Sequence, residues 1–523
     1  MTGRQVFHLP SPVCVETRSV RILLVALLAG LAYPLTLAPY HLGWLMPVLL
    51  AVPVRLSIGA SPRRAFAAGY VWALTGFAAS FYWTYLSLHD IAGLPALLAA
   101  PLTLLLPAWL ALFPALALAL AARWARHSGR PTGTWLLAFP LLMTLADWLR
   151  GWVITGFPWG ALGYTQVPDG PLAGYLPVTG IFGLSWMVAL TAAMLAWLLW
   201  LRQTGNTRPQ RRLIALTVLL VAALWSGGVA LKQREWTQPA GKPLTVSLAQ
   251  GAIPQSLKWD PDAFGLTLRV YAEQVAAARG RLIILPETAF PLMYDEMPAQ
   301  YVNALRDMAA AKGAELVTGA PTRLADGRYF NSVVSVTGRE QRYSKDHLVP
   351  FGEFIPLPWL TGWLYRFMDI PLSGFTPGGT QQTPLTLAGE RVAFNVCYED
   401  SFGEELIGPA REATLLANVS NMAWFGNSNA AWQHLQLAQT RALETGRPMV
   451  RATNTGLTAA IDYRGQVLAE MPQFTRGVLE VTVQPRSGLT PYMRWGNLPV
   501  VLAALAGLAL WWGWTRRQGR KNR

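Results

Sequence analysis

The chain has 523 residues, of which 52% are hydrophobic and only 14% are charged, and it contains 23 tryptophans. This composition excludes an ordinary soluble protein of this size and indicates an integral membrane protein. The formal net charge of +15 does not indicate a nucleic-acid partner, because residues 232–496 hold 24 basic and 24 acidic side chains and the whole excess lies elsewhere.

Long apolar stretches cluster at both ends of the chain, each near the roughly 20 residues that a membrane-spanning helix needs. The sequence therefore predicts a polytopic α-helical membrane protein with about eight spans. The predicted spans are 20–37, 42–57, 65–88, 93–122, 134–150, 175–201, 211–231 and 497–514. This divides the chain into seven spans within 1–231, an inserted domain at 232–496, and an eighth span with a basic tail at 497–523.

The basic residues of the apolar part alternate from loop to loop. Arginines precede the first predicted span and follow the second, fourth, sixth and eighth, whereas the loops at 38–41 and 89–92 have no lysine or arginine. By the positive-inside rule, both termini are expected in the cytoplasm and the inserted domain on the outer face, which is the periplasmic side of a bacterial inner membrane. We do not expect the first span to be a cleaved signal peptide.

The inserted domain changes texture to short β-rich runs that alternate with helical patterns, which is typical of an α/β layered domain. The predicted strands are 244–249, 282–285, 316–319, 332–336, 392–396, 414–417, 457–462 and 477–483. The predicted helices are 264–278, 298–311 and 430–446.

Three fragments of this domain carry side chains that suit acyl transfer to a thiol. Glu287 follows a predicted strand, Lys345 lies in a polar run, and Cys397 ends a run of β-formers. Thiol acylation needs a base and a donor for the oxyanion, and a glutamate and a lysine supply them without a histidine. Taken singly, each has a plainer interpretation: a solvated acid, a surface lysine and a buried cysteine. Cys14 precedes the first span, so we expect no disulfide between it and Cys397.

Seven stretches, taken together and in this order, resemble one protein family. They are Gly156-Phe-Pro-Trp159, the run 250–259, Leu285-Pro-Glu-Thr288, the run 345–356, Asn395-Val-Cys-Tyr-Glu399, the run 418–426, and Trp432-Gln-His434 through Arg447. The chain is similar to the bacterial apolipoprotein N-acyltransferases, the membrane-embedded branch of the nitrilase superfamily. The resemblance implies that the inserted domain is a nitrilase-like αββα sandwich.

The resemblance also assigns roles to residues. Glu287 is expected to be the general base, Lys345 to hold the oxyanion and Cys397 to be the nucleophile. The expected supporting residues are Glu353, Tyr398 and Glu399. Met422 departs from the family pattern, in which an aspartate is expected, and this leaves the role of its loop in acceptor recognition in doubt.

The implied reaction moves an acyl chain from the sn-1 position of a phospholipid, expected to be phosphatidylethanolamine, to the α-amine of the N-terminal diacylglyceryl-cysteine of a lipoprotein. It passes through a Cys397 thioester and needs no cofactor or metal. The apolar segment 358–371 is expected to be a lid in the outer leaflet, or otherwise a buried helix. The expected lipid-contacting residues are Trp159, Trp259, Trp359 and Trp363. We expect a monomer.

Several alternatives remain open from the sequence alone. A transporter is disfavoured because the spans hold almost no ionisable residues beyond Asp147. A closer alternative is a membrane-anchored carbon-nitrogen hydrolase that uses the same three residues on a soluble amide. Asp147 and Arg150 are spaced either to bind a lipid headgroup or to neutralise each other. His347 and His434 are interpreted as hydrogen-bonded structural residues.

Overall fold

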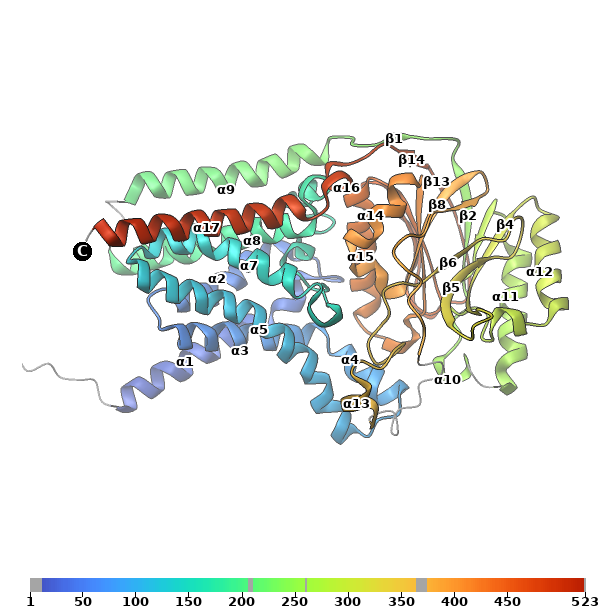
Figure 1. The fold of residues 1–523 in the computed structure, drawn as a ribbon, viewed down its shortest axis with the longest axis horizontal. Helices are drawn as coiled ribbons and strands as arrows, with labels where there is room; N and C mark the ends of the chain where they lie inside the picture. The colour runs from blue at the N-terminus through green and yellow to red at the C-terminus, as the bar shows by residue number, and fades with distance from the viewer. Residues whose placement is uncertain (1–11, 206–209, 259–260, 364–373, 522–523) are drawn as a thin grey trace, which may run out of the picture.

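A computed structural model describes residues 12–205, 210–258, 261–363 and 374–521 and arranges them in two parts (Figure 1). A bundle of long helices lies at one end, and an α/β domain lies at the other. The bundle is built from both ends of the chain, because α17 returns to it after the α/β domain.

The helices of the bundle coincide with the apolar stretches of the sequence. The long ones are α1 (Pro12–Leu31), α2 (Met46–Ser57), α3 (Pro62–Ser80), α5 (Ala96–Ser128), α7 (Phe139–Leu149), α8 (Leu176–Thr204), α9 (Arg211–Lys232) and α17 (Leu498–Lys521). The short ones are α4 (Trp83–Leu86) and α6 (Pro131–Gly133).

Within the described residues, five helical segments are long and apolar enough to cross a membrane, where the sequence predicts about eight. They are Ala96–Ser128, Pro131–Leu149, Pro171–Thr204, Arg211–Lys232 and Leu498–Gln518. Val20–Thr36 and Gly43–Ser57 are apolar but shorter. The predicted span 65–88 is divided, because α3 ends at Ser80 and α4 begins separately at Trp83.

Two six-stranded sheets form the centre of the α/β domain. The first has the order β13-β2-β3-β4-β5-β6 and the second the order β12-β11-β10-β9-β8-β7. The inner pairs β2–β3, β3–β4, β8–β9 and β9–β10 are parallel, and the outer pairs are antiparallel.

The strand bounds show which chain segments build each sheet. The first sheet contains β2 (Leu244–Gln250), β3 (Leu282–Ile284), β4 (Glu315–Arg323), β5 (Tyr329–Ser335), β6 (Arg342–Ser344) and β13 (Gly477–Val483). The second contains β7 (Leu385–Leu387), β8 (Glu390–Val396), β9 (Leu415–Ser420), β10 (Met449–Thr453), β11 (Thr458–Ile461) and β12 (Val467–Met471). A small separate pair joins β1 (Gln238–Pro239) to β14 (Arg486–Ser487).

The two sheets pack face to face because their strands alternate between two apolar faces. In β8, Val392, Phe394 and Val396 belong to the core between the sheets, whereas Ala393 faces the helices behind the sheet. The domain is therefore an αββα sandwich, as the sequence resemblance implies. Figure 1 shows the outer helix pairs on opposite sides of it.

Each outer pair of helices covers one sheet. Helices α11 (Phe264–Ala277) and α12 (Ala299–Ala310) cover the first sheet, while α14 (Gly403–Glu412) and α15 (Ala430–Thr445) cover the second. The remaining short helices are α10 (Gln255–Lys258), α13 (Pro358–Thr361) and α16 (Pro491–Trp495). Because α15 lies between its sheet and the helical bundle, every one of its residues except Trp432 is buried.

Polar side chains of α15 fix the sandwich to the bundle. Gln433 accepts hydrogen bonds from the indole N–H groups of Trp83 (3.2 Å) and Trp159 (3.1 Å). Glu444 accepts one from the backbone N–H of Ile181 at 3.1 Å. That N–H is free because Gly180, at φ 60°, interrupts α8 where the ring of Tyr492 leaves no room for a Cβ atom. These hydrogen bonds join the α/β domain to the helical bundle.

A buried ion pair braces the loop that follows α7. Arg150 Nε lies 3.1 Å from Asp147 Oδ1, and the two side chains are 0% and 4% exposed. The second carboxylate oxygen accepts from the backbone N–H of Leu162 and the hydroxyl of Ser185, while Arg150 donates to the carbonyl oxygen of Trp159. Because both side chains are buried and lie beside each other, the pair neutralises itself, although Arg150 Nη2 has no hydrogen-bond partner among the described residues.

Replacing Asp147 by asparagine tests the role of this pair. Asp147→Asn leaves the Arg150 guanidinium buried without its anion, and we expect the free energy of unfolding in detergent to fall by about 3–5 kcal/mol. The matched control is Asp326→Asn in the exposed pair with Arg328, where solvent screens the charges and we expect little or no loss. Equal losses in the two variants would contradict a bracing role.

Candidate active site

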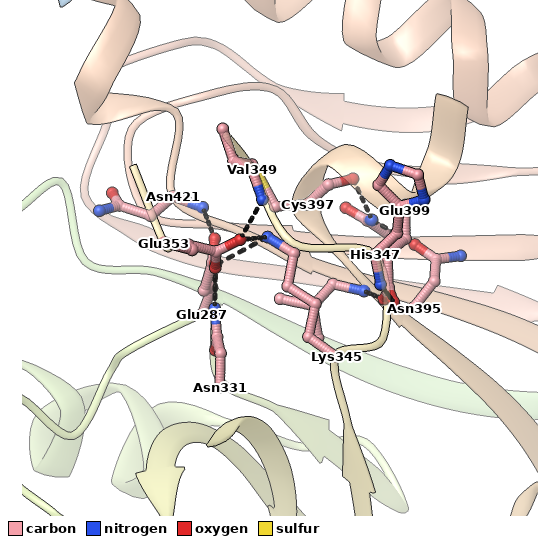
Figure 2. A network of polar contacts seen from close by, with 12 residues as sticks. Glu287, Asn331, Lys345, His347, Val349, Glu353, Asn395, Cys397, Glu399 and Asn421 are labelled. Carbon is pink, nitrogen blue, oxygen red and sulfur yellow. Dashed lines mark hydrogen bonds and ion pairs between the residues drawn. The ribbon is translucent and has the colours of Figure 1, made fainter. Parts of the chain in front are cut away.

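The three residues with candidate chemistry follow the ends of three strands from both sheets. Glu287 comes after β3, Lys345 directly after β6 and Cys397 directly after β8. Because the two sheets are stacked, these strand ends meet at one edge of the sandwich, and Figure 2 shows the side chains gathered there. The tertiary structure thus brings together the residues that the sequence places 58 and 52 positions apart.

Lys345 lies between two carboxylates. Its Nζ atom is 2.8 Å from Glu353 Oε2 and 4.0 Å from Glu287 Oε1, and its side chain is 1% exposed. Burial alone would lower the pKa of Lys345, but Glu353 and Glu287 outweigh it and raise the pKa above its ordinary value. The group is therefore a permanent ammonium ion, suited to stabilise an oxyanion and not to exchange protons.

Asn331, which was not predicted from the sequence, forms hydrogen bonds to both carboxylates. Asn331 Nδ2 donates to Glu287 Oε1 at 2.7 Å and to Glu353 Oε1 at 2.9 Å. The other Glu287 oxygen accepts from the backbone N–H of Asn421 at 2.7 Å. Asn331 is the one amide side chain in strand β5, whose other side chains are apolar or carry a hydroxyl. This difference could have identified Asn331 from the sequence. These bonds fix the direction in which Glu287 can accept a proton.

The backbone of Cys397 adopts a conformation that is unusual for a residue with a side chain. Its φ is 53°, in the left-handed region, at the turn from β8 into a short 3₁₀ helix. Its carbonyl oxygen accepts from Asn418 Nδ2 at 3.2 Å and from His434 Nε2 at 2.9 Å. The two donors hold the turn that presents the free, half-buried thiol.

The environment of Cys397 keeps the thiol protonated at rest. Burial raises its pKa to about 12, and the negative charge of Glu287 adds to this, while Lys345 opposes it. A thiolate does not pre-exist at neutral pH, so the proton must leave as the sulfur attacks. The carboxylates of Glu287 and Glu353 are the acids near the thiol.

His434 is neutral, with its proton on Nε2. Arg451 Nη2 lies 2.9 Å from His434 Nδ1, and because a guanidinium only donates, Nδ1 must accept. Burial and the charge of Arg451 lower the pKa of His434 well below its ordinary value. The histidine therefore acts as a structural clamp on Cys397, as the sequence analysis expects, and the ring of Trp159 stacks on it at 5.7 Å.

Glu399 ties the lysine loop to the cysteine turn. Its carboxylate accepts from the backbone N–H groups of Asp346 (2.7 Å), His347 (3.1 Å) and Val396 (2.6 Å). Burial raises its pKa to about 7 against the charge of Lys345 and these N–H donors. Tyr398 makes a different link, because its hydroxyl donates to the carbonyl oxygen of Gly156 in the bundle at 3.0 Å. The side chains of both residues thus link the cysteine turn to neighbouring segments.

A second buried lysine, Lys258, was not singled out from the sequence. It is 3% exposed, and its Nζ donates to the backbone carbonyl oxygen of Glu287 at 3.1 Å. Burial lowers its pKa to about 8, although Glu287 and Cys397 oppose the shift. On the same short helix, Gln255 accepts a hydrogen bond from the side chain of Asn421. Helix α10 thus contacts both the backbone of Glu287 and the side chain of Asn421.

The four tryptophans expected to contact lipid lie in different settings. Trp359 and Trp363 are 82% and 53% exposed at α13, whereas Trp159 is 4% exposed. Trp159 stacks on His434 next to the Cys397 turn. Because it is buried, it does not contact lipid directly in this structure. Trp259 lies outside the described residues. Met422, where an aspartate was expected, is 2% exposed and packs against Gly456.

An αββα sandwich with cysteine, glutamate and lysine at one edge, joined to a helical membrane part, defines a membrane-bound carbon-nitrogen hydrolase-like enzyme. The model of the carbon-nitrogen hydrolase family matches residues 245–492, and that of the apolipoprotein N-acyltransferase N-terminal domain matches residues 29–194. The chain belongs to the apolipoprotein N-acyltransferase family. It is a multi-pass membrane acyltransferase.

Two relatives at 44% identity or more support this membership. The chain is 56% identical to the apolipoprotein N-acyltransferase of Chromobacterium violaceum, with 96% of each chain covered. It is 44% identical to that of Neisseria meningitidis serogroup B, covering 92% of this chain and 94% of the other. A solved mutant of the Nesterenkonia AN1 amidase of the nitrilase superfamily aligns at 21% identity over 49% of this chain and 95% of that chain, with a TM-score of 0.35.

The geometry around Lys345 predicts that arginine cannot replace it. The site holds a compact ammonium 2.8 Å from Glu353 in a closed space, and a planar guanidinium is longer and bonds in a fork. We expect Lys345→Arg to lower the rate of lipoprotein acylation about as much as Lys345→Ala, by about 10²–10³. If the arginine variant kept most of its activity, Lys345 would be only a structural charge. The matched control is Lys312→Arg, at an exposed position just after the end of α12.

Proposed function

We propose that this enzyme moves an acyl chain from the sn-1 position of a membrane phospholipid, with phosphatidylethanolamine as donor, to the α-amine of the diacylglyceryl-cysteine at the N-terminus of a lipoprotein. The observation that carries the proposal is a protonated, half-buried thiol near a fixed carboxylate and a permanent ammonium. This set suits two successive acyl transfers around one sulfur atom.

In the first half, Glu287 takes the proton of the Cys397 thiol as the sulfur attacks the ester carbonyl. The oxyanion that forms is stabilised by Lys345 and by the backbone N–H of Tyr398. The ester C–O bond then breaks, the leaving glycerol oxygen takes the proton from Glu287, and a lysophospholipid departs. An acyl thioester remains on Cys397.

In the second half, the neutral α-amine of the lipoprotein attacks the thioester carbonyl. Glu287 accepts a proton from the attacking nitrogen, and the same two donors stabilise the second oxyanion. The C–S bond breaks, and the proton returns from Glu287 to the sulfur. The products are an amide and the original thiol, so no cofactor or external oxidant is needed. Lys345 stays protonated throughout because its pKa is raised.

We propose that α13 and its flanks form a lid in the outer leaflet. Trp359, Leu360 and Trp363 are 82%, 52% and 53% exposed, which is unusual for large apolar side chains facing water. A lid embedded among lipid tails would admit a phospholipid ester from the side and exclude water. Residues 364–371 of the predicted lid lie outside the described part of the chain.

The proposed topology has eight spans in a bacterial inner membrane. It divides the monomer into spans one to seven (1–231), a periplasmic catalytic domain (232–496) and an eighth span with a cytoplasmic tail (497–523). The alternating arginines support this topology. The packing supports it as well, because α1, α2 and α3 contribute apolar side chains to the same bundle as the candidate spans.

Thiol labelling in spheroplasts tests this topology. In a background with Cys14→Ser and Cys397→Ser, a cysteine at the exposed position Asp326 should react with an impermeant maleimide. A cysteine at Gln518, near the end of α17, should react only after the membrane is permeabilised. The reverse pattern would place the catalytic domain in the cytoplasm.

A single-turnover experiment separates transfer from hydrolysis. Given phospholipid without an amine acceptor, the enzyme should release about one lysophospholipid per active site and hold the acyl group as a thioester, because the lid excludes water. Adding a diacylated lipopeptide should discharge it. Intact mass and peptide mapping check the adduct on Cys397, and Cys397→Ser, with its weaker nucleophile, should form none.

The same experiment tests the alternative of a carbon-nitrogen hydrolase. Steady release of free fatty acid without any amine would show that water reaches the thioester. An adduct on Cys14 would remove Cys397 from the mechanism. Either result would refute the transferase mechanism proposed for this site.

A further inference from the structure

A cavity of about 240 Å³ lies where the helical bundle meets the catalytic domain. It is bordered by the end of α9 and the linker after it, by the start of α8, and by the end of α15 with the turn between β11 and β12. It shares no lining residue with the catalytic set. In Figure 1 the end of α9 lies at the top beside α16, whereas α13 lies at the bottom.

The cavity lies at the end of a candidate membrane span. Lys232 lines it and is the last residue of α9, one of the five candidate spans. Only 17% of the apolar window of α9 is buried inside the protein, so most of this helix faces the bilayer. A lysine, an arginine and a tryptophan at the end of a span are typical of the membrane–water interface.

Unused donors line this cavity. The indole N–H of Trp236 is buried and has no hydrogen-bond partner among the described residues. The Arg234 guanidinium stacks 4.4 Å from the centre of the same indole ring, and it forms no ion pair with any carboxylate in the described part of the chain. Lys232 Nζ donates to the carbonyl oxygens of Pro168 and Asp169, which leaves one of its three donors.

The nearby carboxylates do not cancel this positive charge. Glu235 is engaged by Arg464 at 3.3 Å and by Arg486 at 3.0 Å, and it also accepts from the hydroxyl of Tyr463. Asp169 is the other acid close to Lys232. The lining therefore offers an N–H group and two cations to an acceptor that carries negative charge and several oxygens.

We propose that this cavity binds the phosphate group of a phospholipid that is not the acyl donor. Trp236 and Arg234 would donate to the phosphodiester oxygens, and the acyl tails would lie along the exposed side of α9. The bound lipid would clamp α9 against the end of α15, where Leu443 and Gly446 line the cavity. The same helix holds Cys397 through His434, so the lipid would support the join between the two parts.

Native mass spectrometry with phosphatidylglycerol tests this site. Cys397→Ser enzyme is used throughout, so that no acyl adduct forms. The double variant Arg234→Gln, Trp236→Phe keeps the ring but removes the indole donor and the charge. We expect it to lose one bound lipid per protein, with an apparent Kd for that lipid at least about tenfold weaker. The matched control is Arg494→Gln, which changes an exposed arginine in α16, just before α17. This variant should keep the lipid.

Two further arms make the test decisive. Trp236→Phe alone, which preserves the charge and packing, should weaken binding of the lipid by a smaller factor than the double variant. Millimolar inorganic phosphate should not displace the lipid, because it lacks the tails. Unchanged lipid binding in the double variant, an equal loss in Arg494→Gln, or full displacement by inorganic phosphate would each overturn the proposal.

Discussion

The active site depends on one buried cation. The Lys345 ammonium is almost without solvent, so its charge has to be balanced by protein groups, and Glu353 and Glu287 do so. Those carboxylates in turn need donors, which Asn331, Asn421 and the backbone N–H of Val349 provide. Burial raises the pKa of the neighbouring thiol, the charge of Glu287 adds to this effect, and Lys345 opposes it.

A second constraint is the helix that lies between membrane and catalyst. Helix α15 carries glutamines, a histidine, an arginine and a glutamate, a composition typical of an exposed face, yet nearly all of it is buried. Gln433 and Gln436 bond to the loops of the bundle on one side, and His434 reaches the carbonyl of Cys397 on the other. The position of the nucleophile relative to the membrane is therefore set by hydrogen bonds, which are directional, and not by apolar contact alone. An enzyme whose two substrates are held in a bilayer benefits from such a rigid connection.

Local sequence patterns predicted some elements correctly, whereas other elements depend on contacts between distant parts of the chain. The strand at 477–483 and the helix starts at 264 and 430 are confirmed, because apolar periodicity and turn residues act within a few positions. Strands β6, β7, β10 and β12 were missed. Three of them are edge or near-edge strands of three to five residues, and β10 carries Arg451, whose burial depends on Asp400 in another element. The span count within the described residues also differed, partly because the apolar helices Val20–Thr36 and Gly43–Ser57 are short.

The sequence by itself determined the membrane character, the insertion of an α/β domain between two apolar regions, and the identity of the residues with candidate chemistry, since composition and motif order are properties of the chain. Only the tertiary structure decided how those residues work together. Stacking of two sheets brings the ends of β3, β6 and β8 to one edge. Burial there raises the pKa of the thiol and that of Glu399, whereas Glu353 and Glu287 raise the pKa of the lysine against the effect of burial. It also showed that Trp159 is packed beneath the nucleophile while Trp359 is exposed. Such differences depend on distances between segments that the order of residues does not encode locally.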